Sequence, residues 1–214
     1  MRFVPSSVIF DFDGTLVDSA HIKREAFFEV LPDLPHAKGC LDTLLLTKPP
    51  LDRYSIADRL AHALADGPVA RNMAREIAED YSIVCREKVG DAPEIAGASE
   101  IISGLKERGI PLFISSATPQ NELLQVVAGR PWSGAFQGIY GSPDTKLEHL
   151  DRIRRGVCGS PQSLLFIGDS EHDADTAEVF GCIFGAVGPR CDTLPGATFR
   201  GFSLRELHAA LGIP

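Results

Sequence analysis

Acidic residues crowd the end of the first apolar run of this chain. Asp11, Asp13 and Asp18 lie in the stretch "VIFDFDGTLVDS", after its apolar start, with Gly14 among them. Carboxylates at the end of a strand repel one another and gain nothing from apolar packing. We therefore expect a partner outside the chain to balance this charge.

Two further predicted strands end in polar residues. The run "IPLFISS" continues into "ATP", and the run "SLLFIGD" continues into "SEHD". Because ligands bind beyond the carboxyl ends of parallel strands, Asp11, Asp13, Asp169 and Asp173 are expected to converge in one crevice. Hard oxygen ligands with no cysteine among them favour Mg²⁺ over zinc.

Short apolar runs and helical patterns must position these residues. Continuous apolar runs are typical of strands that are covered on both faces. The predicted strands span residues 6–12, 110–116, 136–141, 163–169 and 181–187, and the predicted core helices span 98–109, 119–129, 146–157 and 203–211. This alternation predicts an α/β fold, a doubly wound parallel sheet of the Rossmann-like kind.

A helical insert separates the first strand from the rest of the sheet. Four segments with helical periodicity and no strand pattern span residues 21–31, 37–46, 53–66 and 70–89. We predict a catalytic core of residues 1–17 and 92–214 and a helical cap domain of residues 18–91. Asp18 is expected to serve the hinge between them.

Composition narrows the class of partner. The chain has 214 residues, 44% of them hydrophobic and 23% charged, with a formal net charge of −8. This acidity argues against nucleic acid or an anionic membrane as the main partner. The five cysteines are scattered and odd in number, which disfavours a disulfide framework or a zinc site. With no signal peptide or transmembrane run in view, we expect a cytoplasmic protein; the oligomeric state is not readable.

Four motifs, in order, resemble those of the haloacid dehalogenase superfamily. "DFDGTL" resembles its first motif, "LFISSA" its second, Lys146 in "GSPDTKLEHL" its third and "LLFIGDSEHD" its fourth. Together they nearly span the chain. They resemble most the phosphatase branch with an α-helical cap, which includes phosphoglycolate phosphatase-like enzymes.

This resemblance implies a Mg²⁺-dependent phosphatase that hydrolyses a small phosphomonoester, such as a sugar phosphate or phosphoglycolate, through an aspartyl-phosphate. Asp11 would be the nucleophile and Asp13 the general acid and base. Asp11, Asp169 and the backbone carbonyl of Asp13 would hold Mg²⁺. The remaining implied residues are Asp173, which would support the metal shell, and Ser116, Ala117 and Lys146, which would bind the phosphoryl group.

Several of these assignments have ordinary structural alternatives. Asp173 could merely favour a helix N-terminus, and Lys146 could be a solvated lysine at a helix start. Ser115 competes with Ser116 for the phosphoryl-binding role, and His172 is expected on a helix surface. In the cap, Lys23 and Arg53 are predicted to contact substrate, although such side chains are more often solvated.

Other functions remain open at this point. A phosphomutase of the same family is the nearest alternative, but sugar phosphomutases carry a histidine where Lys23 aligns. Dehalogenases lack an acid at the position of Asp13. A phosphonate hydrolase needs a Schiff-base lysine in the cap, for which Lys23 and Lys48 are candidates. A non-catalytic phospho-ligand-binding protein would have no need of Asp13 as an acid.

Overall fold

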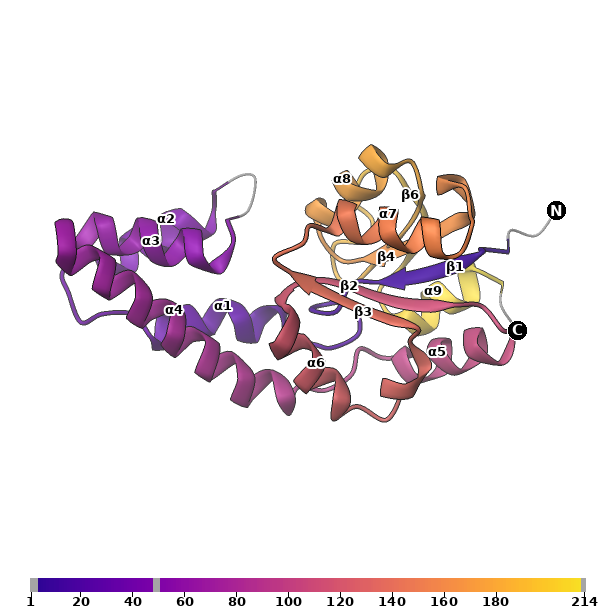
Figure 1. Cartoon of the computed structure of the whole chain (residues 1–214), viewed down its shortest axis with the longest axis horizontal. Coiled ribbons are helices and arrows are strands. Elements are labelled where there is room, and N and C mark those ends of the chain that lie inside the picture. Colours follow the sequence, from indigo (N-terminus) through magenta and orange to yellow (C-terminus); the bar gives the residue numbers. More distant parts are fainter. Residues whose placement is uncertain (1–3, 48–50, 213–214) are drawn as a thin grey trace. The chain divides into compact units, whose positions relative to one another are not determined.

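The computed structural model describes residues 4–47 and 51–212 and divides the chain into two compact units (Figure 1). One unit is formed by the residues up to Asp18 and from Ala92 onward, and the other by Ser19–Asp91. The second boundary coincides with the predicted one, and the first lies one residue later.

The larger unit is built on a parallel sheet of six strands within the described residues. The strands are β1 (Ser7–Phe10), β2 (Leu112–Pro119), β3 (Gly138–Ser142), β4 (Leu164–Gly168), β5 (Ile183–Val187) and β6 (Ala197–Gly201). Their order is β3-β2-β1-β4-β5-β6, with every neighbouring pair parallel. The direction in which the strands are added reverses between β1 and β4. This switch point is where open α/β sheets bind ligands.

The central strands form because their residues can be buried on both faces. Every residue of β1 and of β4 is buried. Phe166 of β4, which is fully buried, belongs to an apolar cluster that includes Ile9 of β1 and Leu150 and Ile153 of the 146–157 segment. Burying one such side chain stabilises the fold by about 1.5–3 kcal/mol, an upper estimate because the unfolded chain is already partly compact.

Helices cover both faces of this sheet (Figure 1). They are α5 (Ala98–Glu107), α6 (Gln120–Ala128), α7 (Lys146–Gly156), α8 (Glu171–Phe180) and α9 (Leu204–Ala210). Helices α7 and α8 pack together on one face, and α5 and α9 pack together on the other. Short 3₁₀ turns, Ser133–Ala135 and Pro161–Ser163, precede β3 and β4. The predicted doubly wound α/β fold is therefore confirmed.

Helices and the loops between them make up the described residues of the smaller unit. Its helices are α1 (Ala20–Glu29), α2 (Ala37–Leu45), α3 (Arg53–Leu64) and α4 (Gly67–Gly90). The rings of Phe27 and Tyr81 stack with centroids 4.1 Å apart and join α1 to α4. The four predicted helical segments match these helices to within a few residues. Lys48, Pro49 and Pro50 lie outside the described residues, so the Schiff-base candidate Lys48 has no structural account.

The edge strand β6 has no counterpart in the predicted set, and α8 is predicted only as a helix without bounds near His172 and Asp173. The edge strand β6, "ATFRG", lacks an apolar run, and only its last residue is buried. Helix α8 has the mixed sequence "EHDADTAEVF", in which acidic residues alternate with small ones. Neither carries a clear periodic signal, because β6 is an edge strand and α8 buries mostly small side chains.

Candidate active site

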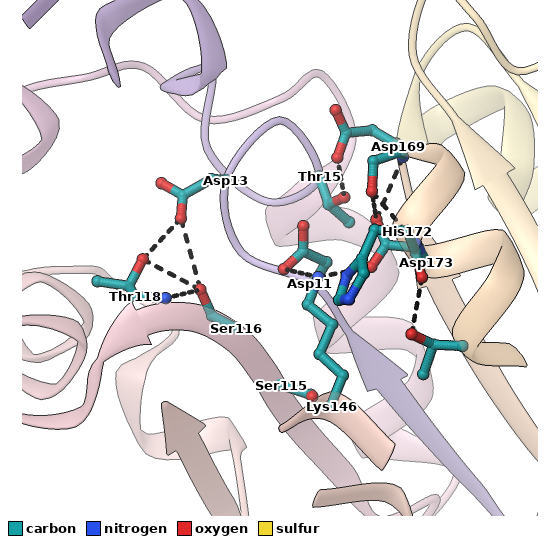
Figure 2. A network of polar contacts seen from close by, with 12 residues as sticks. Asp11, Asp13, Thr15, Ser115, Ser116, Thr118, Lys146, Asp169, His172 and Asp173 are labelled. Carbon is teal, nitrogen blue, oxygen red and sulfur yellow. Dashed lines mark hydrogen bonds and ion pairs between the residues drawn. The ribbon is translucent and has the colours of Figure 1, made fainter. Parts of the chain in front are cut away.

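The polar ends of β1, β2 and β4 lie together at the carboxyl edge of the sheet (Figure 2). Asp11 directly follows β1, and its backbone N–H donates to the carbonyl of Ile167 in β4 at 2.8 Å. Asp169 directly follows β4, and Ser116 and Thr118 occupy the end of β2. Residues separated by more than 100 positions thus converge because three parallel strands end at the same edge.

Lys146 joins two buried carboxylates at the centre of this site (Figure 2). Its Nζ lies 2.9 Å from Asp11 Oδ1 and 2.6 Å from Asp173 Oδ1. The three side chains are at most 8% exposed. Removing one member of such a buried ion pair typically costs about 3–5 kcal/mol, because an uncompensated charge stays behind.

Capping motifs place Lys146 and Asp173. Thr145 caps α7 in a capping box with Glu148, so Lys146 is the first residue of that helix. Ser170 and Asp173 form a second capping box at the start of α8. Asp173 therefore has two roles: Oδ2 accepts from the backbone N–H of Ser170, and Oδ1 accepts from Lys146. Asp173 thus lies at a helix N-terminus and also contacts the lysine of the charged cluster.

Electrostatics in the cluster indicate a shortage of positive charge. Burial raises the pKa of Asp11 well above its usual value, against the opposing effect of Lys146, and neighbouring carboxylates raise it further. Burial likewise raises the pKa of Asp169 to about 7, helped by the charge of Asp173. Although burial alone would lower the pKa of Lys146, Asp11 and Asp173 raise it above the usual range. A further cation would favour the ionised carboxylates.

Asp11, Asp169 and Asp173 could hold that cation. One carboxylate oxygen from each lies within 4.8 Å of the others. Thr15 Oγ1 donates to Asp169 Oδ1 at 3.4 Å. A Cβ at Gly14, where φ is +79°, would lie 2.4 Å from Asp169 Oδ2. The site therefore requires a glycine in the loop after β1, and this set of hard oxygen donors fits Mg²⁺.

Asp13 turns toward β2, away from the lysine (Figure 2). Its Oδ2 accepts from Thr118 Oγ1 at 2.8 Å, and Ser116 Oγ lies 3.5 Å from the same oxygen. Strand alternation predicts the same side for Asp11 and Asp13 only while the chain stays extended. Beyond β1 the chain turns, since the backbone N–H of Leu16 donates to the carbonyl of Phe12 at 2.9 Å.

Ser115 and Ser116 have different surroundings, although both are buried. Ser115 Oγ lies 2.9 Å from His149 Nδ1 of α7, whereas Ser116 lies near Asp13. Ala117, between Ser116 and Thr118, is exposed. The geometry favours Ser116 over Ser115 as the residue that can meet a phosphoryl group beside Asp13.

The remaining predicted positions lie on α8 and in the cap unit. His172 is exposed on α8, and partial burial of its ring together with Lys146 lowers its pKa. Arg53 donates to Ser82 Oγ at 3.0 Å, and its guanidinium lies over the Tyr81 ring at 5.1 Å. These contacts lie within the cap unit. Substrate contacts of Lys23 and Arg53 stay predictions.

Three residues of the site carry no prediction from the sequence: Thr15, Thr118 and His149. Thr15 is part of "DGT", and Thr118 lies two positions after Ser116, on the same side of an extended strand. That spacing was the available signal for Thr118. His149 has only the helical offset of three residues from Lys146 as a signal.

Comparison with known proteins gives the family of this chain. The sequence model of the haloacid dehalogenase-like hydrolases matches residues 8–187. The chain belongs to this family of hydrolases, as its four motifs predicted. Its curated relatives carry the name of a phosphatase, and the chain is a phosphatase of the family, a phosphoric monoester hydrolase.

One such relative is the phosphoglycolate phosphatase of Chromobacterium violaceum, 28% identical over 203 residues, which cover 85% of this chain and 84% of the relative. Among solved structures, a putative hydrolase of the family from Bacillus subtilis, YfnB, bound to magnesium, has a TM-score of 0.72 at 18% identity over the full length of both chains. A putative β-phosphoglucomutase from Thermotoga maritima has a TM-score of 0.70 at 20% identity and covers 96% of this chain and 98% of its own. These two likenesses show the fold.

Among the described residues, no helix is both long and apolar enough to cross a membrane.

Proposed function

We propose that this chain is a Mg²⁺-dependent phosphatase that hydrolyses a small phosphomonoester through an aspartyl-phosphate on Asp11. The observation that carries this proposal is the pairing of buried Asp11 with Lys146 at 2.9 Å, beside Asp13 and Asp169. A binding protein needs positive charge for an anion, and it has no need of a carboxylate crowded against the ligand.

Each side chain has a defined part in the proposed reaction. An Asp11 carboxylate oxygen attacks phosphorus, and the bond from phosphorus to the ester oxygen breaks. Asp13 gives a proton to the departing alcohol, then takes one from the water that attacks the aspartyl-phosphate and releases inorganic phosphate. Such proton transfers typically contribute about 10²–10⁴-fold in rate. Lys146 and Ser116 would stabilise the charge on the phosphoryl oxygens.

Asp11, Asp169 and the backbone carbonyl of Asp13 are the proposed ligands of Mg²⁺, with Asp173 supporting them through Lys146 and Ser170. When bound, Mg²⁺ supplies positive charge beside carboxylates whose pKa values burial raises. The magnesium bound by the Bacillus subtilis neighbour is consistent with this choice.

A sugar phosphate or phosphoglycolate is the proposed class of substrate. Support comes from the relatives named phosphoglycolate phosphatase. The test is a panel of phosphomonoesters that includes 2-phosphoglycolate and hexose phosphates, assayed for released phosphate with Mg²⁺ and with EDTA. We expect Mg²⁺-dependent release from at least one small ester. Absence of release across the panel, or undiminished release in metal-free buffer, would contradict the proposal.

The phosphomutase alternative is tested separately, because a solved neighbour carries that name. A mutase must return the phosphoryl group from Asp11 to a sugar hydroxyl before water takes it. Lys23 stands where sugar phosphomutases carry a histidine, and a permanently charged lysine is poorly suited to relaying a proton near neutral pH. We expect phosphorus NMR of hexose phosphates, with a bisphosphate primer, to show inorganic phosphate. Growth of an isomeric sugar phosphate without phosphate would favour the mutase.

A further inference from the structure

Two hydroxyl groups of β2 lie beside the carboxylate of Asp13. Thr118 Oγ1 donates to Asp13 Oδ2 at 2.8 Å, while Ser116 Oγ is 3.5 Å from the same oxygen (Figure 2). Thr118 is only 7% exposed. A buried hydroxyl without a partner costs about 1–3 kcal/mol, so this contact stabilises both side chains where they stand.

The hydroxyl groups form a chain with a direction. The backbone N–H of Thr118 donates to Ser116 Oγ at 3.0 Å, and Ser116 Oγ donates to Thr118 Oγ1 at 3.1 Å. Thr118 then has its own proton for Asp13 Oδ2. This bond to Oδ2 restricts the orientation of the Asp13 carboxylate.

The local backbone holds this chain in place. The pairing of β2 with β3 changes register between Ser115 and Pro119. Across the gap, Gln120 Nε2 donates to the carbonyl of Ile139 at 2.9 Å, and Gln120 Oε1 accepts from the N–H of Gly141 at 2.6 Å. The side chain thus takes the place of strand hydrogen bonds. Ser116 and Thr118, two positions apart, are both presented to Asp13.

We propose that Thr118 is a positioning residue for the acid and base Asp13: through its hydrogen bond to Oδ2 it holds the carboxylate in the orientation from which Asp13 protonates the ester oxygen and then takes a proton from water. The inference rests on the proposed phosphatase function. The end of β2 would then have two roles: Ser116 binds the phosphoryl group, and Thr118 orients the proton donor Asp13. Loss of the Thr118 hydroxyl should slow the step in which the leaving group departs. The size of this effect should therefore depend on how much the leaving group needs a proton.

The test compares two esters in Thr118→Val, which removes the hydroxyl and nearly keeps the shape. The quantity to compare is kcat/KM. It reflects the steps up to release of the alcohol and does not depend on the later hydrolysis of the aspartyl-phosphate. An alkyl ester such as 2-phosphoglycolate needs its leaving oxygen protonated, whereas p-nitrophenolate leaves without a proton. We expect a loss of about 10–100-fold for the alkyl ester, part of the 10²–10⁴-fold typical of general acids, and less than about threefold for p-nitrophenyl phosphate.

Two controls separate positioning from a structural effect. Thr118→Ser keeps the hydroxyl and should restore most of the alkyl-ester activity. Thr176→Val removes another buried threonine hydroxyl, one that donates to the carbonyl of His172 at 2.7 Å, and should change both esters by the same factor. Asp13→Asn should reproduce the selective loss more strongly, and adding Thr118→Val to it should cost little more.

The outcomes distinguish this inference from the function on which it rests. Wild-type protein that hydrolyses neither ester overturns the phosphatase proposal itself. Active wild type with equal losses for both esters in Thr118→Val, or with no rescue by serine, overturns only the role of Thr118. If the valine variant does not fold, Thr118→Ala takes its place. The same ratio of kcat/KM losses for the two esters is then measured and compared with that of Thr118→Ser.

Discussion

Asp11 is held between two opposing influences on its charge. Burial raises its pKa, and Lys146, at 2.9 Å, lowers it. A nucleophilic carboxylate must be ionised when the ester arrives, so the site depends on the cation beside it as much as on Asp11. The same burial excludes water and strengthens each electrostatic contact.

Replacing Asp11 by asparagine tests the nucleophile. Asp11→Asn nearly preserves volume and keeps an oxygen for Lys146, so we expect the unfolding transition to persist. Turnover should fall by at least about 10³-fold, because an amide oxygen does not form the intermediate. Asp175→Asn, at an exposed acid of α8 outside the site, is the matched control and should keep activity. Appreciable steady-state turnover by a sequence-verified Asp11→Asn sample would remove Asp11 from this role.

At the scale of elements, helix starts position the charged groups. Lys146 begins α7, an electrostatically poor place for a cation, and its carboxylate partners offset that cost. Thr145 fixes where the helix begins, through the hydrogen bond that its Oγ1 accepts from the N–H of Glu148 at 3.3 Å. The cap of α9 is similar: Ser203 Oγ accepts from the N–H of Glu206, also at 3.3 Å.

These two caps give a matched pair of variants. Thr145→Ala and Ser203→Ala should each lower the free energy of unfolding by about 0.5–2 kcal/mol. Only Thr145→Ala should also lower kcat/KM, because its helix carries Lys146. Denaturant unfolding and steady-state kinetics measure the two effects. If Ser203→Ala lowers activity as much as Thr145→Ala, the loss reflects general destabilisation and the positional argument fails.

His149 joins α7 to β2 through Ser115 and is fully buried. Burial lowers its pKa from the ordinary value near 6.5. Above about pH 6.5, His149 is neutral in both the folded and the unfolded chain, so it does not lower the free energy of unfolding. As the pH falls below that value, the unfolded chain takes up a proton that the folded chain resists, and stability declines.

The corresponding prediction compares wild type with His149→Gln at pH 7.5 and pH 5.5. Glutamine can still meet Ser115 but does not titrate. We expect the wild-type free energy of unfolding to fall more between these values than that of the variant, since only wild type contains the imidazole. Equal falls would mean that His149 contributes nothing to acid sensitivity.

At the scale of the whole molecule, periodicity and motif order predict the sheet, its helices and the helical insert. Strands such as β1 and β4 are recognisable because burial on both faces demands continuous apolar runs. The edge strand β6 is only partly buried, so its sequence does not need a continuous apolar run and does not contain one. Thr118 and His149 are missed for another reason. Their partners, Asp13 and Ser115, are distant in sequence, and only the fold brings them together.

Metal and protons are expected to compete for Asp169, and this competition affects the folding equilibrium of the whole molecule. Burial, then the charge of Asp173, raise the pKa of Asp169 to about 7, against about 3.9 in an unfolded chain. A group with a raised pKa contributes stability that is fully present below the unfolded value and is lost as the pH rises through the folded one. In EDTA, Asp169 therefore makes the protein less stable at pH 8 than at pH 6.

Mg²⁺ must displace that proton at pH 6 but not at pH 8. We expect the rise in melting temperature with saturating Mg²⁺ to be larger at pH 8, where binding at 100 times Kd stabilises by about 2.7 kcal/mol. Asp169→Asn should abolish both the rise and its pH dependence, whereas Asp175→Asn, an exposed acid of the same helix region, should keep them. Scanning calorimetry of the three proteins in EDTA and in Mg²⁺ measures this. An equal rise at both pH values would show that Asp169 does not hold the proton with which the metal competes, and a full rise in Asp169→Asn would exclude Asp169 as a ligand.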